Sequence, residues 1–352
     1  MKKSKVYLTL QNGKVFEGYG FGASGDAIGE LVFTTGMVGY DKTLTDPAYY
    51  GQIVVQTFPM IGNYGVIASE FEAEKPYLSA YVVREFCEEP SNFRTEETLD
   101  SYMKRAGVIG IYGVDTRELT RIIREAGVMN ACVSSKPLKD LACLSVNTVK
   151  DAVKAVTPER TEVFGKEGAN YTLAMIDYGA KRSAVEFWTS YDCKVYRLPA
   201  TVTAEEIFAL GVDGVVLSEG PGDPTENTAA IAEIQKLIGK KPVFAVGLGH
   251  QMLALALGGS TYKMKYGHRG GNQPVKYLSS GRVYVSTQNH GFEVTANSVK
   301  EGEIAFVNVN DGGVEGIFYD AKKAIGVQFD PSACSAAGEA NFLVGKFIGY
   351  LK

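Results

Sequence analysis

The sequence predicts a two-domain α/β protein: a mixed, β-rich domain, followed by an open, mostly parallel sheet with helices on both faces. Two patterns predict this. The first 150 residues contain short runs of alternating apolar and polar residues, whereas apolar strand-like runs alternate with helical segments from residue 171 onward. A chain of 352 residues is also too long for one ordinary core. We therefore expect domains at 1–150 and 171–352, joined by a polar linker at 151–170.

The first domain should begin with a β-hairpin and contain two helices. Alternating apolar residues over 6–10 lead to the turn dipeptide Asn12-Gly13, and residues 15–16 start the return strand. Asp115 and Glu118 form a capping-box pattern ahead of apolar residues spaced for one helix face. Similar spacing predicts a short helix over about 96–106.

The second domain should contain buried strands that alternate with helices, because its apolar runs are short and continuous. The expected strands are 173–176, 214–217, 242–246 and 325–327, and a helix is expected over about 250–257.

Composition excludes several classes of protein. The chain has 45% hydrophobic and 22% charged residues and a net charge of −4, so nothing favours binding to nucleic acid or to an anionic membrane. No apolar segment follows the basic start, and the longest apolar stretch, 243–257, is too short and too polar to span a bilayer. We expect a cytoplasmic protein.

The cysteines indicate neither disulfides nor a metal site. Five cysteines without CxxC spacing are typical of reduced thiols in a cytosolic protein: Cys87, Cys132, Cys143, Cys193 and Cys334. The three histidines, His250, His268 and His290, show no metal-ligand spacing either. We expect no metal and no cofactor.

Three loops follow predicted strands of the second domain, and such loops meet at the carboxyl edge of an open parallel sheet. They are the Gly/Pro-rich turn 217–224, the sharp strand-to-helix turn 245–251 and the segment 328–332. Each of these loops taken alone could be an ordinary turn, since glycine and proline are common in turns of all proteins. Three in one domain favour a functional site.

The same loops carry a resemblance to a known family. Turn 245–251 resembles the nucleophile elbow of class I glutamine amidotransferases, Gly-x-Cys-x-Gly-x-Gln, and 328–332 resembles their His-Pro-Glu segment. Nearly the whole chain resembles the small subunit of carbamoyl-phosphate synthetase. The matching runs are 36–40, 44–47, 61–65, 113–117, 177–181, 220–224, 267–272 and 288–292. The runs before residue 150 make the resemblance specific, because generic amidotransferases lack that domain.

The resemblance also shows what is missing. In the family, a cysteine thiolate attacks glutamine, an imidazole relays the proton and a carboxylate orients the imidazole. Those positions correspond here to Gly247, Asp330 and Ser332. Glycine has no side chain, and an aspartate with an ordinary pKa of about 3.9 is a poor general acid at neutral pH. Changes at all three positions favour natural loss over a single engineered knock-out.

Other family positions are partly retained. Gly36 stands where the family has a glutamine-contacting serine, and Arg269 and Gln273 replace histidines. Family glutamine contacts correspond, with residue type retained, to Gly220, Gly222, Leu248, Gln251, Asn289, Gly291 and Phe292. The resemblance thus implies a glutamine pocket in part, although each of these residues also suits a turn, a helix start or the core.

The resemblance implies a small subunit of carbamoyl-phosphate synthetase, in pyrimidine or arginine precursor synthesis, that has lost glutamine hydrolysis. It would be a structural or regulatory partner of a large subunit that uses ammonia. Two alternatives stay open: a free-standing protein that binds glutamine or a related amino acid, and an amidotransferase with an unusual nucleophile such as Cys334. No Walker-type phosphate loop occurs, so ATP chemistry would lie in the partner.

Overall fold

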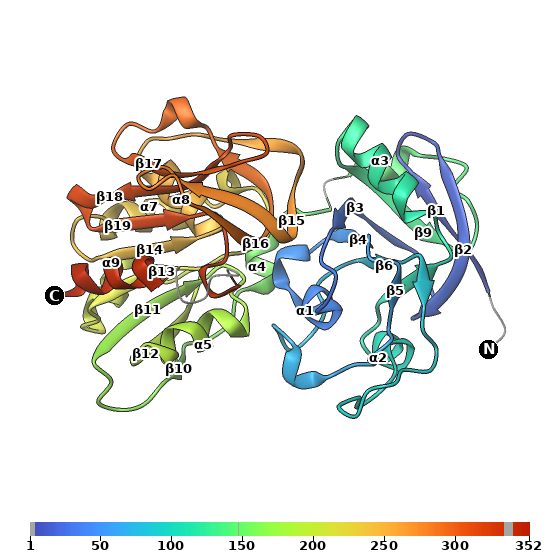
Figure 1. The fold of residues 1–352 in the computed structure, drawn as a ribbon, viewed down its shortest axis with the longest axis horizontal. Coiled ribbons are helices and arrows are strands. Elements are labelled where there is room, and N and C mark those ends of the chain that lie inside the picture. Colours follow the sequence, from blue (N-terminus) through green and yellow to red (C-terminus); the bar gives the residue numbers. More distant parts are fainter. Residues whose placement is uncertain (1–3, 147, 334–340) are drawn as a thin grey trace. The chain divides into compact units, whose positions relative to one another are not determined.

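The computed structural model describes residues 4–146, 148–333 and 341–352. The chain divides into two compact units, 1–150 and 151–352. Figure 1 colours the first unit blue to green and the second green to red. Each unit is described by itself below.

The first unit is built on a closed barrel with the strand order β1-β2-β8-β6-β4-β3-β9. These strands are β1 (Lys5–Leu10), β2 (Val15–Gly22), β3 (Ala27–Thr34), β4 (Gln52–Gln56), β6 (Ala80–Val82), β8 (Ile109–Tyr112) and β9 (Met129–Ser134). Two short strands, β5 (Met60–Ile61) and β7 (Glu85–Phe86), pair separately in parallel. The predicted hairpin is confirmed: β1 and β2 are antiparallel, and Gly13 in their turn has φ 85°.

Three α-helices accompany the barrel: α1 (Tyr40–Thr45), α2 (Leu99–Arg105) and α3 (Thr116–Ala126). Both predicted helices are confirmed as α2 and α3. The Asp115 side chain accepts hydrogen bonds from the backbone N–H groups of Arg117 and Glu118, and thereby satisfies two donors that have no partner within α3.

The second unit contains a ten-stranded sheet in the order β10-β12-β11-β13-β14-β19-β18-β17-β15-β16. The strands are β10 (Glu162–Phe164), β11 (Tyr171–Asp177), β12 (Cys193–Pro199), β13 (Gly214–Leu217), β14 (Val243–Val246), β15 (Thr261–Tyr277), β16 (Val283–Val294), β17 (Glu303–Asn308), β18 (Val314–Tyr319) and β19 (Ala324–Val327). Strands β12, β11, β13, β14 and β19 are parallel neighbours, which confirms the predicted parallel core. Strands β15 to β18 extend this core with antiparallel pairs that the sequence patterns did not predict.

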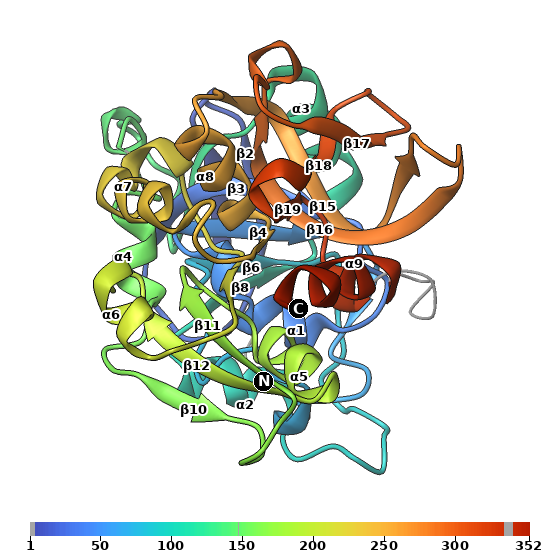
Figure 2. The same cartoon turned by 90° about the vertical axis from the view of Figure 1, so that its left-hand side faces the viewer.

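Helices cover both faces of the parallel core, as predicted. The helices are α4 (Ala152–Val156), α5 (Arg182–Ser190), α6 (Ala204–Ala209), α7 (Thr228–Leu237), α8 (Leu248–Ala256) and α9 (Asn341–Leu351). Alternate residues of the core strands pack against α6, α7 and α8 on one side, and against α5 and α9 on the other (Figure 2). Their continuous apolar runs therefore reflect burial on both faces.

Residues 151–170, expected to be a linker, are folded with the second unit. Helix α4 buries Val153 and Val156, and the Thr157 hydroxyl donates a 2.8 Å hydrogen bond to the carbonyl of Asp177 in β11. Strand β10 pairs antiparallel with β12 at the edge of the sheet. The polar composition of this stretch thus reflects an edge strand and turns. Among the described residues, no helix is long and apolar enough to cross a membrane.

Candidate active site

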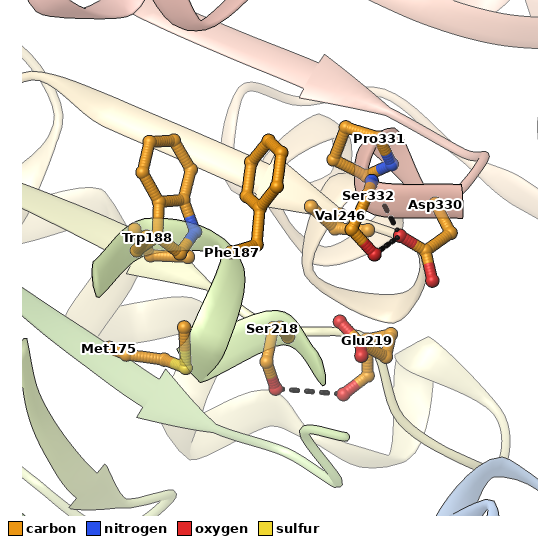
Figure 3. Close-up of a pocket in the computed structure, with 11 residues that line it drawn as sticks. Met175, Phe187, Trp188, Ser218, Glu219, Val246, Asp330, Pro331 and Ser332 are labelled. Atoms are coloured by element: carbon orange, nitrogen blue, oxygen red, sulfur yellow. Dashed lines mark hydrogen bonds between the residues drawn. The ribbon is translucent and has the colours of Figure 1, made fainter. Parts of the chain in front are cut away.

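The three predicted loops meet at one edge of the sheet. Strands β11, β13, β14 and β19 are adjacent and parallel, so the segments that follow them all leave the sheet at its carboxyl edge. Residues from three of these loops line a single small pocket, together with Met175 and with Phe187 and Trp188 of α5 (Figure 3). The loop residues in its wall are Ser218, Glu219, Val246, Asp330, Pro331 and Ser332.

Gly247 forms a sharp turn between β14 and α8. Its backbone has φ 55° and ψ −114°, which is a strained conformation for any residue with a side chain. The Gly247 N–H donates a 2.9 Å hydrogen bond to the carbonyl of Val327 in β19. A Cβ built on this glycine would lie 3.1 Å from the Cβ of Glu219. A side chain at the turn would therefore point at Glu219.

Asp330, where the resemblance expects an imidazole, forms an ion pair with Lys181. Lys181 directly precedes α5, and its Nζ also lies 4.0 Å from a carboxylate oxygen of Glu219. The three side chains are only 13–15% exposed. They form a buried group of one cation and two carboxylates, here called the Lys181 cluster.

Ser332, expected at the carboxylate position, is bound to the same aspartate. Its backbone N–H and its hydroxyl donate to one Asp330 carboxylate oxygen, at 2.8 and 2.6 Å. Both bonds are drawn in Figure 3. The Asp330 backbone N–H donates to the carbonyl of Thr287 in β16 at 3.0 Å. Asp330 is thus an acceptor at the start of the short 3₁₀-helix Pro331–Ala333, and among the described residues no hydrogen bond joins it to an imidazole.

The Lys181 cluster separates the pKa values of its two acids. Burial and the negative charge of Asp330 raise the pKa of Glu219 to about 7, although the Lys181 ammonium opposes them. Burial would also raise the pKa of Asp330, but the charge and hydrogen bond of Lys181, with those from Ser332, hold it below its ordinary value. At neutral pH Asp330 is therefore ionised, whereas Glu219 is partly protonated and partly ionised. A carboxyl group with a pKa near 7 can act as a general acid or base, but the described part of the chain places no thiol beside it.

The described histidines do not supply the missing relay. His250 in α8 is fully buried, its ring nitrogens have no hydrogen-bond partner among the described residues, and burial lowers its pKa to about 3. The imidazole of His290 in β16 lies within hydrogen-bond distance of the Phe292 carbonyl and the Gln288 side chain, at 2.8 and 2.9 Å. Both rings therefore act as parts of the core.

Two of the expected glutamine contacts have structural roles in the fold. The Gln251 amide donates to the Phe292 carbonyl at 2.8 Å and to the Gln328 side chain at 3.0 Å, linking α8 to β16 and to the end of β19. A Cβ on Gly220 would lie 2.2 Å from the carbonyl oxygen of Tyr178, so close backbone approach requires glycine there. Their retention thus has a reason apart from glutamine.

The other expected contacts fall into three groups. Gly222, with φ 92°, lies in the turn after β13, and Leu248 is buried as the first residue of α8. Asn289 and Gly291 lie in β16, beside Phe292. Gly36 follows β3 in the first unit, so it is described only within that unit. Cys334, proposed as an alternative nucleophile, lies outside the described residues.

One group of side chains has the composition of a metal site. Ligand atoms of His268, His290 and Glu315, all buried, lie within 4.8 Å of one another. Burial opposes protonation of His268, but hydrogen bonds and charges from Asp311 and Glu315 outweigh it and raise its pKa to about 9. The Gln288 amide also bridges His290 and Glu315, at 2.9 and 2.8 Å. A proton and a metal ion compete for the same imidazole nitrogen, and in this structure hydrogen bonds among the side chains occupy the ligand atoms.

The sequence patterns missed Lys181 and Glu219 as members of the site. Lys181 lies in a segment noted for its resemblance to the family and follows the carboxyl end of β11 by four residues, and Glu219 lies in the Gly/Pro-rich turn 217–224. The rule that sites gather at the carboxyl ends of parallel strands could have identified Lys181, but its partner is 149 residues away in the chain.

The chain matches two family models that agree with this architecture. "Carbamoyl-phosphate synthase small chain, CPSase domain" matches residues 8–133, and "Glutamine amidotransferase class-I" matches 174–349. The second unit is thus a class I glutamine amidotransferase domain in fold and sequence. A comparison with solved structures matches the chain to a glutamine amidotransferase from Thermotoga maritima, with 21% identity, a TM-score of 0.38, and coverage of 46% of this chain and 76% of that one.

Full-length relatives define the family more closely. The carbamoyl phosphate synthase small chain of Clostridium perfringens is 43% identical over 350 residues, covering 98% of this chain and 99% of the relative. The pyrimidine-specific small chain of Bacillus subtilis is 40% identical over 348 residues, covering 98% and 95%. The chain belongs to the carbamoyl phosphate synthase small chain family, as the sequence motifs predicted.

Proposed function

We propose that this chain is a carbamoyl phosphate synthase small chain that has lost glutamine hydrolysis and serves as a structural or regulatory partner of a large subunit. In this proposal the large subunit takes free ammonia and performs the ATP-dependent steps. The product would supply pyrimidine or arginine precursor synthesis.

The Lys181 cluster is the observation that carries the proposal. An active member needs a thiol at the elbow and an imidazole within reach of it. Here the turn residue is Gly247, and Asp330, the counterpart of the imidazole, is ion-paired with Lys181. An ionised aspartate paired with an ammonium group neither accepts a thiol proton nor donates one to leaving ammonia. Loss of the nucleophile alone lowers the rate of a triad enzyme by about a million-fold.

The partner role is supported by the family relationship over both units. Relatives that match 98% of the chain are named as small chains, which implies a large one. The barrel unit matches the family's own CPSase domain, and it exposes Met37 and Val38 at 71% and 82% in one of the family-like runs. These two neighbouring apolar side chains are our candidates for part of the surface that a large subunit would cover.

The test is synthesis of carbamoyl phosphate by this chain reconstituted with its cognate large subunit, comparing glutamine and ammonia as nitrogen donors. We expect product with ammonia and only background product with glutamine, and no glutamate release by the small chain alone. The control is a reconstituted enzyme with an active small chain, which should use both donors.

Glutamate release that increases with purity would contradict the proposal and favour an unusual nucleophile. Failure to bind a large subunit would favour a free-standing amino-acid-binding protein.

A further inference from the structure

We propose that Lys181 is a built-in occupant of the vacated catalytic centre, whose ammonium group takes the place of a ligand between Asp330 and Glu219 and holds the site closed. This inference rests on the proposed function, because it assigns Gly247 and Asp330 to the lost centre. The inference adds that a side chain of the same protein fills the centre. Removing the lysine side chain should convert it into a binding site for small primary ammonium ions.

The local backbone directs Lys181 into the centre. One carboxylate oxygen of Asp177, at the end of β11, accepts hydrogen bonds from the N–H groups of Gly179 and Ala180 at 2.7 and 2.6 Å. This turn brings Lys181 to the start of α5, where its backbone N–H donates to Glu219 at 3.2 Å. The backbone and the side chain of one residue thus bind two different loops.

The lysine connects three segments that leave the sheet at the same carboxyl edge. Its own segment follows β11, Glu219 follows β13, and Asp330 follows β19. Burial of an unpaired carboxylate is costly, and two near one another are worse unless a cation lies between them. The ammonium group therefore permits both acids to remain at 13–15% exposure.

The cluster also covers the elbow. The Cβ of Glu219 lies 3.1 Å, and its Cα 3.4 Å, from the position that a Cβ at residue 247 would take. Both contact atoms are fixed to the backbone of the Gly/Pro-rich turn 217–224, so this contact cannot be removed by rotating a flexible side-chain end. An amide group of glutamine would need this same space in front of the elbow. We infer that glutamine can reach the turn only if the segment that carries Glu219 moves.

Chemical rescue tests the occupant role directly. Lys181→Ala removes a propylammonium fragment, so n-propylammonium chloride is the matched probe. We expect Lys181→Ala to unfold at lower urea concentration than the wild type, and n-propylammonium to raise its unfolding midpoint in a saturable manner. Sodium chloride and tetramethylammonium chloride at equal ionic strength should not do so, since neither ion can donate hydrogen bonds to the carboxylates. Wild type and Lys181→Met, in which a side chain fills the space, should not respond.

A midpoint of Lys181→Ala equal to that of the wild type would overturn the proposal, as would equal effects of n-propylammonium and sodium chloride. If Lys181→Ala does not fold, the urea unfolding midpoint of the double variant Lys181→Met/Asp330→Asn is compared with that of Lys181→Met. We expect this double variant to be more stable than Lys181→Met, because it removes the carboxylate that the lysine neutralises. A double variant no more stable than the single one would contradict the occupant role. Glutamate release is a separate readout, so failure of this proposal and failure of the proposed function are distinguishable.

Discussion

A side chain placed at position 247 would meet Glu219 first, because the added Cβ would lie 3.1 Å from the Cβ of that glutamate. A thiol there would experience two opposing influences. The start of α8 favours a thiolate, whereas the neighbouring carboxylate disfavours it once it is ionised. Burial raises the pKa of Glu219 to about 7, so it is mostly ionised at pH 8.

We therefore predict that Gly247→Cys will react slowly with iodoacetamide at pH 8, and that Gly247→Cys/Glu219→Gln will react about tenfold faster. Tenfold corresponds to about one pKa unit of thiolate stabilisation, or about 1.4 kcal/mol. Mass spectrometry of the peptide that contains residue 247 separates this reaction from those of the native cysteines. Neither variant should release glutamate from glutamine, because no imidazole takes the thiol proton. Equal alkylation rates, or turnover by Gly247→Cys, would show that our assignment of these residues is wrong.

At this scale, the sequence is informative about single positions and poorly informative about pairs. Gly247 was placed at a sharp turn by its neighbours in the chain, and its φ of 55° agrees. The pairing of Lys181 with Asp330 could not be predicted in the same way, since it joins residues 149 positions apart. Such a contact exists only after β11 and β19 have taken their places in the sheet, with β13 and β14 between them.

At the scale of elements, strands buried on both faces were predictable because their apolar runs are continuous, as in β13 and β14. The antiparallel strands β15 to β18 were not predictable from the sequence. Strands β15 and β16 pair with register shifts between Lys263 and His268 and between Gly270 and Gln273. Each shift interrupts the two-residue alternation on which recognition of a half-buried strand depends. The sequence patterns predicted no strand within residues 151–170 for a related reason: three-residue β10 is too short to leave a pattern.

Helix α1 contains a buried acid whose ionisation should destabilise the fold. Asp41 is 1% exposed, and neither carboxylate oxygen has a well-formed hydrogen bond among the described residues. Burial raises its pKa to about 7, an effect that the backbone of Ile67 offsets only in part. The folded-state pKa thus exceeds the unfolded value of about 3.8. The folded protein holds this proton over a pH range in which the unfolded chain has released it, so the contribution of Asp41 to stability falls as pH rises from about 4 to 7.

Asp41→Asn should remove this dependence. At pH 8 we expect the variant to be more stable than the wild type by about 2–4 kcal/mol, which corresponds to roughly three pKa units less some relaxation. Near pH 4 the advantage should disappear. Urea unfolding at several pH values measures the change, and Asp140→Asn, at an exposed aspartate of the same unit, is the matched control. A stability difference that does not vary with pH would show that folding leaves the pKa of Asp41 unchanged.

At the scale of the whole molecule, each unit has its own apolar core, and the two match different family models. All three residues of the Lys181 cluster lie in the second unit, so the cluster does not explain what the first unit does. Under the proposed function, a first unit of 150 residues without a catalytic role suggests selection for binding. The apolar side chains of Met37 and Val38, at the start of the segment that leads into α1, are the candidates for this contact.

We predict that Val38→Asp will weaken binding to the cognate large subunit by about 10- to 100-fold, because a charge would replace an apolar anchor of about 1–3 kcal/mol. Val38 is 82% exposed, so the substitution should leave the stability of the free chain almost unchanged. Val163→Asp is the matched control: it adds the same charge at a valine of the second unit that is 52% exposed. Co-elution of the co-expressed subunits and a titration by calorimetry measure the difference.

If both variants bind as tightly as the wild type, the contact lies elsewhere on the chain. If the wild-type chain does not co-elute at all, the partner role is wrong, and a free-standing amino-acid-binding protein becomes the better interpretation.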